Sequence, residues 1–305
     1  MSRPDHEDAS IAQLMQAPLA TQAEAIAQMG LVPSGLLILM SPCEQQCFFC
    51  AQPAVTHPPR SDWTPQDRID ELLNANADLG LQRLLIGGTE PTTHPSFALT
   101  LKRAQSMGFQ HIELMTSGTR LADPGVATEW FDLGIRAIAS PIYGRTPEAH
   151  DGVTGVPTHR RLLDGFDAAT AAGIQVHTHT LALRRTLPEL SRLAALCLER
   201  WNSPLTIAPA RPKPGVWRFE QDAPSLEELI DALGDADPHS ITLTGWPHCI
   251  LPQLPRASAD IIRLYFLGQS RQTPKTCSPC SVRTDCPGVV DALVLRDGSA
   301  NLRPL

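Results

Sequence analysis

Short apolar segments alternate with amphipathic segments along most of the chain, and this alternation limits the folds open to it. Glycines or prolines separate many of the segments. The apolar segments, taken as strands, lie at residues 36–40, 84–86, 111–115, 135–139, 174–180 and 205–208. Strands that are joined by helices pair in parallel with right-handed crossovers. The pattern therefore predicts an α/β fold, either a doubly wound sheet or a barrel.

Composition and charge narrow the class of partner. With 305 residues, 42% of them hydrophobic, the chain suits one large domain, alone or with a small appendage. A net charge of −7 argues against nucleic acid as the main partner, because phosphate binding needs a basic face. Residues 1–10 are too polar for a secretory signal, and no apolar run reaches the ~18 residues of a membrane span. We expect a cytoplasmic protein without a membrane partner.

Most of the eight cysteines fall into two tight groups, which in a cytoplasmic protein indicates metal ligands rather than disulfides. The first group, Cys43, Cys47 and Cys50, directly follows the first predicted strand. Three thiolates on one loop can hold three irons of a cubane iron–sulfur cluster and leave the fourth iron open to a small molecule. A zinc knuckle or a chance cluster is the alternative.

This spacing, with the aromatic Phe49 before the last cysteine, resembles the signature of the radical S-adenosylmethionine (radical SAM) enzymes. The resemblance implies that Cys43, Cys47 and Cys50 hold a catalytic [4Fe–4S] cluster, whose open iron is chelated by the amino and carboxylate groups of SAM. Reductive cleavage then gives a 5′-deoxyadenosyl radical, which abstracts hydrogen from a substrate. The implied fold is a partial (β/α)6 TIM-like barrel at residues 32–215, preceded by a helical extension at 1–31, with chemistry at the carboxyl ends of the strands.

The loop after the second predicted strand resembles the Gly-Gly-Glu-Pro loop with which the family binds the SAM amino group. Here it reads Gly87-Gly88-Thr89-Glu90, with Thr89 as an extra residue. Two glycines let the backbone approach a ligand closely. Whether Glu90 or a backbone carbonyl makes the contact stays open.

Later loops carry further resemblances. Thr116 and Ser117 lie in a turn like the family's Thr-Asn-Gly turn after the third strand. Ser140 stands where the family hydrogen-bonds the ribose or carboxylate of SAM, and Ile207 stands where an apolar side chain covers the adenine. The residues predicted to bind the cofactor are therefore Phe49, Gly87, Gly88, Thr89, Glu90, Thr116, Ser117, Ser140 and Ile207.

Strand alternation indicates candidates for substrate contacts. Glu113 lies on the polar face of the third strand, where it either lines the barrel or is a buried, paired carboxylate. His177 and His179 share one face of the fifth strand. They could be metal ligands, acid–base groups or polar lining, and we favour contacts with substrate or SAM. His150 belongs to a segment that resembles a family loop with a structural, helix-capping role.

The second cysteine group lies near the carboxyl end, with Cys249 followed by a C-x2-C-x5-C run of Cys277, Cys280 and Cys286. The run resembles the core of SPASM and twitch domains, which carry auxiliary [4Fe–4S] clusters. Position 290 is Val where SPASM has another cysteine, so one auxiliary cluster is the most that this region can fully ligate. Zinc or unliganded thiols are the alternatives. We assign residues 216–305, with a helix near 261–267, to this domain, and Cys197 to the core.

The resemblance implies the reaction type and leaves the substrate open. Peptide or protein maturation is the first hypothesis, because a fully ligated auxiliary cluster could accept the substrate electron. Residues 1–31 look short for a leader-peptide-binding domain, and this weakens the peptide hypothesis. Oxidation or rearrangement of a sugar, cyclitol or cofactor precursor is the second hypothesis. Both need a flavodoxin- or ferredoxin-type reductant. A non-catalytic iron–sulfur or zinc protein for electron transfer or sensing is the alternative from another class.

Overall fold

Seven parallel strands form one curved sheet in the computed structural model, which describes residues 34–50, 63–210, 218–256, 271–284 and 286–305. Each strand pairs with the next along the chain, without the reversal of strand order that defines a doubly wound sheet. The predicted α/β partial barrel is therefore confirmed. The strands are β1 (Gly35–Leu39), β2 (Arg83–Gly88), β3 (His111–Met115), β4 (Ile135–Pro141), β5 (Gln175–Ala182), β6 (Leu205–Pro209) and β7 (Ile241–Leu243).

The seventh strand extends the sheet beyond residue 215, where the sequence pattern places the end of the barrel. β7 pairs in parallel with β6, with Leu205 opposite Ile241. A strand of three residues carries too little periodicity to be assigned to the sheet from sequence. The predicted extension at 1–31 and the helix near 261–267 lie outside the described residues.

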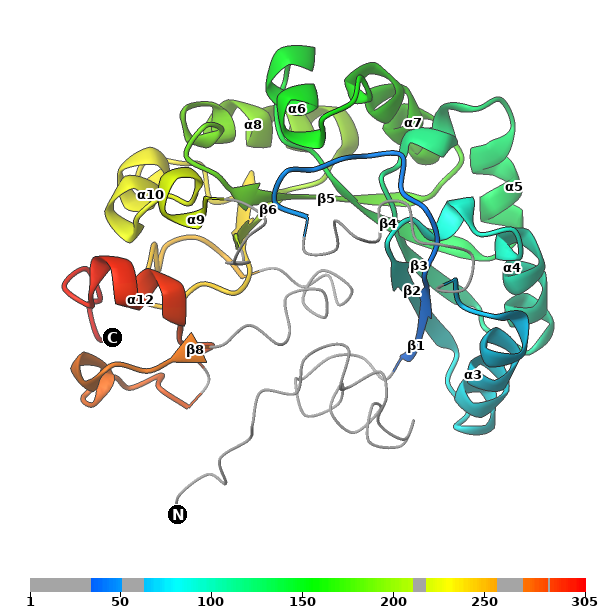
Figure 1. The fold of residues 1–305 in the computed structure, drawn as a ribbon, viewed down its shortest axis with the longest axis horizontal. Helices are drawn as coiled ribbons and strands as arrows, with labels where there is room; N and C mark the ends of the chain where they lie inside the picture. The colour runs from blue at the N-terminus through cyan, green and yellow to red at the C-terminus, as the bar shows by residue number, and fades with distance from the viewer. Residues whose placement is uncertain (1–33, 51–62, 211–217, 257–270, 285) are drawn as a thin grey trace.

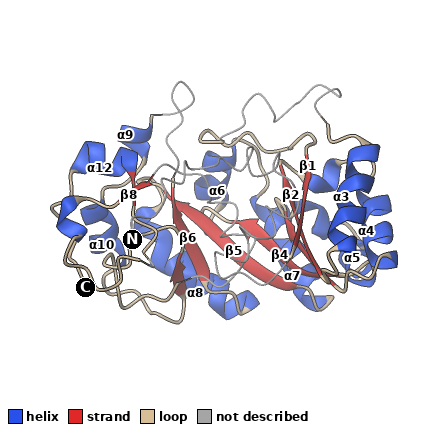
Figure 2. Cartoon of the chain, turned by 90° about the horizontal axis from the view of Figure 1, so that it is seen from below, coloured by secondary structure: helices blue, strands red, loops and turns tan. Residues whose placement is uncertain are grey.

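Helices cover the outer side of the curved sheet (Figure 1), and the same arrangement is visible from below in Figure 2. None of the helices in the described ranges combines the length and hydropathy needed to cross a membrane. The main helices around the barrel are α3 (Gln66–Asp78), α4 (Phe97–Ser106), α5 (Val126–Asp132), α6 (Pro147–Thr154), α7 (His159–Ala171) and α8 (Leu190–Trp201), with 3-10 turns η3 (Pro91–Thr93), η4 (Thr119–Ala122) and η5 (Leu187–Glu189).

Strand alternation separates side chains that face the helices from those that face the barrel interior. Gly35 faces the helices, since a Cβ built on it would lie 2.9 Å from the side chain of Asn76 in α3. Residues 37 and 39 share this side, and residues 36 and 38 face the interior. Because paired residues of parallel strands share a side, the register assigns a side to residues of the later strands too.

The carboxyl-terminal part adds small elements beside β7. These are α9 (Phe219–Asp222), α10 (Leu226–Leu233), β8 (Arg271–Gln272), η6 (Lys275–Cys277), β9 (Val289–Val290) and α12 (Asp291–Asp297). β8 and β9 pair antiparallel and form a separate two-stranded sheet.

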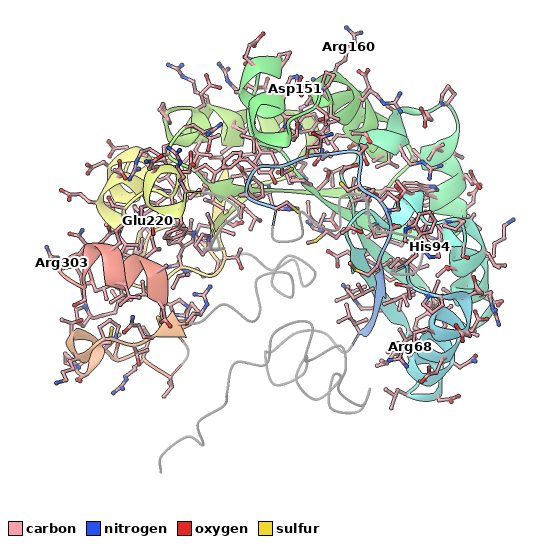
Figure 3. All side chains as sticks on the ribbon, viewed as in Figure 1. Arg68, His94, Asp151, Arg160, Glu220 and Arg303 are labelled. Carbon is pink, nitrogen blue, oxygen red and sulfur yellow. The ribbon has the colours of Figure 1, made fainter. Side chains whose placement is uncertain are left out.

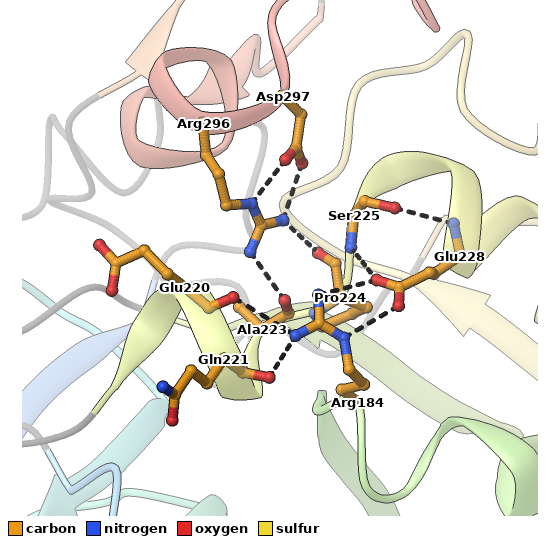
Figure 4. Close-up of polar contacts among 9 residues, drawn as sticks. All are labelled: Arg184, Glu220, Gln221, Ala223, Pro224, Ser225, Glu228, Arg296 and Asp297. Atoms are coloured by element: carbon orange, nitrogen blue, oxygen red, sulfur yellow. Dashed lines mark hydrogen bonds and ion pairs between the residues drawn. The ribbon is translucent and has the colours of Figure 1, made fainter.

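Two arginines hold the segment at residues 220–228: Arg184 joins it to the barrel, and Arg296 joins it to α12 (Figure 4). Arg184, which follows β5, donates to both carboxylate oxygens of Glu228 in α10, at 2.9 and 3.0 Å. Arg296 of α12 donates to the carbonyl oxygens of Ala223 and Pro224 at 2.8 and 2.9 Å. Bidentate and carbonyl contacts of this kind fix geometry as well as adding energy.

Replacing Glu228 with Gln tests this contact, because Gln at the third helical position keeps the capping box with Ser225 but removes the charge. The Arg184 side chain lowers the pKa of Glu228 to about 2 from 4.5. A lowered folded-state pKa contributes stability that is complete above pH 4.5 and is lost as the pH falls towards 2. Urea unfolding should therefore show a loss of about 0.5–1 kcal/mol at pH 7 that shrinks below pH 4.5.

The exposed Glu227→Gln variant, in the same helical turn, is the control. It shares any effect on the helix dipole but not the arginine contact. Equal losses in both variants, or a Glu228→Gln deficit that is constant over the acid range, would contradict the assignment.

Candidate active site

The first three cysteines lie together on the loop that follows β1, at the carboxyl ends of the strands. Cys43, Cys47 and Cys50 are each partly buried, and the N–H of Cys50 donates to the carbonyl of Cys47 at 2.9 Å. Burial raises the pKa of the Cys47 thiol to about 12, with a smaller effect from Cys50, and raises that of Cys43 as well. Metal ligation requires thiolates, so a bound cation must compensate the negative charge that burial disfavours.

These residues fit an iron–sulfur cluster by the chemistry of their donors, because three soft thiols within one loop are what such a cluster needs. Among the described residues, no three cysteine, histidine or carboxylate side chains already surround one point as metal ligands. The loop therefore supplies donors of the right kind, and their sulfurs would have to converge when a cluster binds.

The cysteine loop is supported from the side by α6. The N–H of Gln46 donates to the carbonyl of Thr154 at 2.7 Å, at the end of α6. The ring of Phe49 lies edge-on to that of Tyr143, with 5.5 Å between ring centroids. Phe49 thus packs beneath the loop, next to the end of β4.

The segment at His150 forms part of α6 rather than the expected loop, and it caps the helix that follows. Asp151, labelled in Figure 3, accepts the N–H groups of Thr158 and His159 at 2.9 Å each and so caps α7. His150 is fully buried and its Nδ1 accepts the N–H of Tyr143 at 3.2 Å. Burial lowers the pKa of His150 to about 4, so its ring is neutral at neutral pH.

The glycine loop after β2 lies against the start of the cysteine loop. Gly88 has φ +142°, and a Cβ there would lie 1.9 Å from the carbonyl oxygen of Leu39, so only glycine fits. Thr89 accepts the N–H of Ser41 at 3.0 Å and donates to the carbonyl of the same residue. Gly87, opposite Ile38, faces the barrel interior, where a Cβ built on it would lie 3.4 Å from the side chain of Ile38. Thr89, the extra residue, thus holds the loops after β1 and β2 together.

Glu90 is a buried carboxylate that joins the ends of β2 and β3. Its Oε1 accepts the hydroxyls of Thr92 and Thr116 at 2.6 and 2.7 Å, and its Oε2 accepts the N–H of Ser117 at 2.6 Å. Burial raises the pKa of Glu90, and the neighbouring Glu44 adds to the effect. Because both oxygens are used within the protein, Glu90 holds the turn after β3 in place.

Glu44, which the sequence analysis does not single out, is a second carboxylate at the same place. It accepts hydroxyl hydrogens from Ser117 and from Thr119, the latter at 2.8 Å. Glu44 is solvent-exposed, whereas Glu90 is fully buried. The only signal in the sequence is a charged residue directly after the first cysteine, and charge on a loop does not reveal a partner 73 residues away.

The structure does not bring Ser140 and Ile207 to this group. Ala139 pairs with the interior-facing His177, so Ser140 points to the helix side, where its hydroxyl lies 2.8 Å from a Cβ built on Gly118. Ile207 pairs with Thr180 on that same side and is fully buried. Both residues pack behind the strands.

Glu113, His177 and His179 all face the barrel interior. Glu113 is 2% exposed, and its Oε2 lies 3.7 Å from a guanidinium nitrogen of Arg83 in β2. It is therefore a buried, paired carboxylate as well as a residue that lines the barrel. Burial lowers the pKa of His177 to about 4, helped by His111 and Arg83. Burial and His177 lower the pKa of His179 to about 3. Both imidazoles are therefore neutral at neutral pH.

The four cysteines of the second group, all within the described residues, share the lining of one cavity, although their sulfurs do not converge on one point. Cys249, Cys277, Cys280 and Cys286 line one cavity beside β9. The N–H of His248 points at the sulfur of Cys286, 3.5 Å away. Arg256 donates to three backbone carbonyls around Cys249, at 3.0–3.3 Å. Four thiols around one cavity fit a fully ligated metal site.

A parallel partial barrel with a three-cysteine loop at the carboxyl ends of its strands defines an α/β enzyme with an iron–sulfur cluster. Comparison with protein families gives the particular family: residues 37–197 match the Radical SAM superfamily model. The chain therefore belongs to the radical SAM superfamily and uses a [4Fe–4S] cluster and SAM.

Curated relatives share the sequence over different lengths. The chain is 28% identical to the GTP 3',8-cyclase of Paracoccus denitrificans (strain Pd 1222) over 273 residues, 86% of this chain and 76% of that protein. It is 30% identical to the GTP 3',8-cyclase of Bradyrhizobium diazoefficiens over 161 residues, 50% of this chain. This second match spans 46% of the relative's length.

Solved structures share the fold. The structure of anSMEcpe with bound AdoMet aligns with a TM-score of 0.60 at 13% identity, over 89% of this chain and 93% of that one. Streptococcus suis SuiB bound to its precursor peptide SuiA aligns with a TM-score of 0.53 at 15% identity, over 76% and 52% of the two chains. At sequence identities this low, the likeness shows a shared fold and nothing more.

The buried position of Glu90 predicts a large effect of Glu90→Gln. Glutamine has one acceptor oxygen, so its NH2 group would face a hydroxyl or N–H that donates to Glu90. We expect a loss of about 1–3 kcal/mol in the free energy of unfolding, measured with urea. Exposed Glu71→Gln on α3 is the control, and a Glu90→Gln loss no larger than the control's would refute the role of Glu90.

Proposed function

We propose that Cys43, Cys47 and Cys50 hold the cluster that cleaves SAM, and that the resulting radical abstracts hydrogen from a substrate in the barrel interior. The cluster supplies the electron for this cleavage when SAM is bound. The observation that carries the proposal is the network of Glu44, Glu90 and Ser117, which ties the cysteine loop to the ends of β2 and β3. A ligand on the open iron would lie against these strand ends.

We select the proposed SAM-binding residues by their position relative to the cysteine loop. The interior-facing Gly87 and the residues at the ends of the strands lie next to the cysteine loop and are proposed to contact SAM. Ser140 and Ile207 are proposed to act indirectly, by supporting β4 and β6 from the helix side. The proposed contacts are Phe49, Gly87, Gly88, Thr89, Thr116 and Ser117, with Glu44 added and Glu90 as their support.

The four carboxyl-terminal cysteines are proposed to hold one auxiliary [4Fe–4S] cluster. Their shared cavity supports a single, fully ligated site. The proposed domains are the extension at 1–31, the barrel at 32–215 with β7 added to its sheet, and the cluster domain at 216–305. We further propose a cytoplasmic protein with a flavodoxin- or ferredoxin-type reductant, since free cluster thiols persist in a reducing compartment.

For the substrate, we propose a small polar molecule that is oxidised or rearranged. The curated relatives are named for the cyclisation of a nucleotide, GTP. The barrel interior adds support, because Arg83, Glu113, His177 and His179 offer both donors and acceptors there. Peptide maturation is the second candidate, since SuiB of similar fold was solved with its precursor peptide. Because the sequence identity to SuiB is low, the similarity supports a shared fold and not a shared substrate.

Cysteine variants of the anaerobically reconstituted protein test the two clusters. The wild type should bind about eight irons, four per cubane, and form 5′-deoxyadenosine from SAM with dithionite. Cys47→Ala should lose about half of the iron and all SAM cleavage. Cys286→Ala should lose the other half and keep SAM cleavage.

The control is Cys197→Ala, which changes a buried helix cysteine and should keep both properties. Zinc found in place of the second four irons would contradict the proposed auxiliary cluster. A fully loaded, reduced protein that forms no 5′-deoxyadenosine would favour the electron-transfer or sensor alternative.

The interior residues are tested through substrate-stimulated SAM cleavage, with GTP as the first probe and SuiA-like peptides as the comparison. We choose His179 for substitution because its Nδ1 is buried without a hydrogen-bond partner among the described residues. His179→Gln should reduce stimulation by the small molecule about 10-fold or more, and leave the affinity for SAM unchanged. If peptides alone stimulate SAM cleavage, a peptide becomes the preferred substrate and the small molecule is rejected.

A further inference from the structure

Gln45, between the first two cysteines, has a buried donor that the rest of the site does not explain. Its side chain is 4% exposed. The amide nitrogen Nε2 has no hydrogen-bond partner among the described residues. A buried amide N–H without an acceptor costs free energy, about 1–3 kcal/mol. Native proteins rarely keep such a group without a functional role or a bound partner that satisfies it.

The amide oxygen of the same side chain contacts a cluster ligand. The thiol of Cys47 donates to Oε1 of Gln45, with 3.6 Å between sulfur and oxygen. The backbone N–H of Gln45 also interacts with the sulfur of Cys43 and lowers its pKa. Gln45 therefore lies against two of the three cysteines.

Iron binding would reverse the hydrogen bonding at Cys47. A ligating cysteine is a thiolate, which has no hydrogen to donate and accepts hydrogen bonds instead. The oxygen of Gln45 would then face a negatively charged sulfur. A half-turn of the terminal side-chain torsion exchanges Oε1 for Nε2 and presents the unpartnered donor to the sulfur. One rotation thus removes both the repulsion and the unsatisfied N–H.

We infer that Gln45 is a positioning residue that donates an N–H···S hydrogen bond from its side chain to the Cys47 thiolate in the loaded enzyme. Hydrogen bonds to cluster sulfurs tune reduction potentials. The bond withdraws electron density from the sulfur and stabilises the reduced cluster. Gln45 therefore raises the midpoint potential of the SAM-binding cluster. This inference rests on the proposed cluster site at Cys43, Cys47 and Cys50.

Redox titration of the reconstituted protein, followed by electron paramagnetic resonance (EPR), tests this inference. Gln45→Met keeps the length of the side chain but removes the donor, and should move the midpoint of the SAM-responsive signal to a more negative potential. Gln45→His restores an N–H donor and should bring the midpoint back towards the wild type. Gln46→Met, the same change at the exposed neighbouring residue, should leave it unchanged.

Only loaded molecules give the signal, so partial loading does not distort the midpoint. Equal midpoints for Gln45→Met, Gln46→Met and the wild type would overturn the inference. So would a Gln45→His midpoint no closer to the wild type than that of Gln45→Met. Failure of both Gln45 variants to load iron, with Gln46→Met loaded, would overturn it in favour of a role in assembly. A wild type without a cluster would instead refute the proposed site.

Discussion

The carboxylate of Glu90 lies fully buried between the ends of neighbouring strands, and the arrangement of the site depends on its hydrogen bonds. It accepts hydroxyls from Thr92 and Thr116 and the N–H of Ser117. Its backbone carbonyl accepts the hydroxyl of Ser41, at the start of the cysteine loop. A single residue after β2 thus fixes the loop after β1 and the turn after β3. In a parallel barrel these ends are where ligands bind.

The site accumulates negative charge as a consequence. Burial is the main cause that raises the pKa of Glu90 and of Cys43, since charged groups are poorly solvated there. The carboxylate of Glu44 raises the pKa of Glu90 further, and both carboxylates raise that of Cys43. Such a site favours cations. Iron supplies one, and the sulfonium of SAM supplies another, so the electrostatics suit the cofactors that the family uses.

Much of the fold and part of the site could be predicted from sequence. The strand–helix alternation and the cysteine spacing are local patterns, and they led to the parallel α/β sheet and the cysteine loop; the resemblance to radical SAM enzymes chose the barrel over a doubly wound sheet. Alternation also assigned Glu113, His177 and His179 to one side of their strands. Ser140 and Ile207 were placed by resemblance, and only the register shows that they face the helices.

Other features depend on contacts that local patterns cannot reveal. Glu44 meets Ser117, 73 residues away, and Glu90 meets it across 27 residues. The donor of Gln45 is notable only because it is buried without a partner among the described residues. The pairing of the short β7 with β6 likewise follows from tertiary structure. Burial and hydrogen-bond partners are properties of the folded chain.

The most direct test of the account is whether SAM binds the iron of the cluster at Cys43, Cys47 and Cys50. Electron–nuclear double resonance on the reduced protein with SAM labelled at its amino nitrogen and carboxylate oxygen measures this. The account predicts hyperfine coupling from both labels, lost in Cys47→Ala and kept in Cys286→Ala. A reduced, fully loaded cluster that shows no coupling to either label would contradict it.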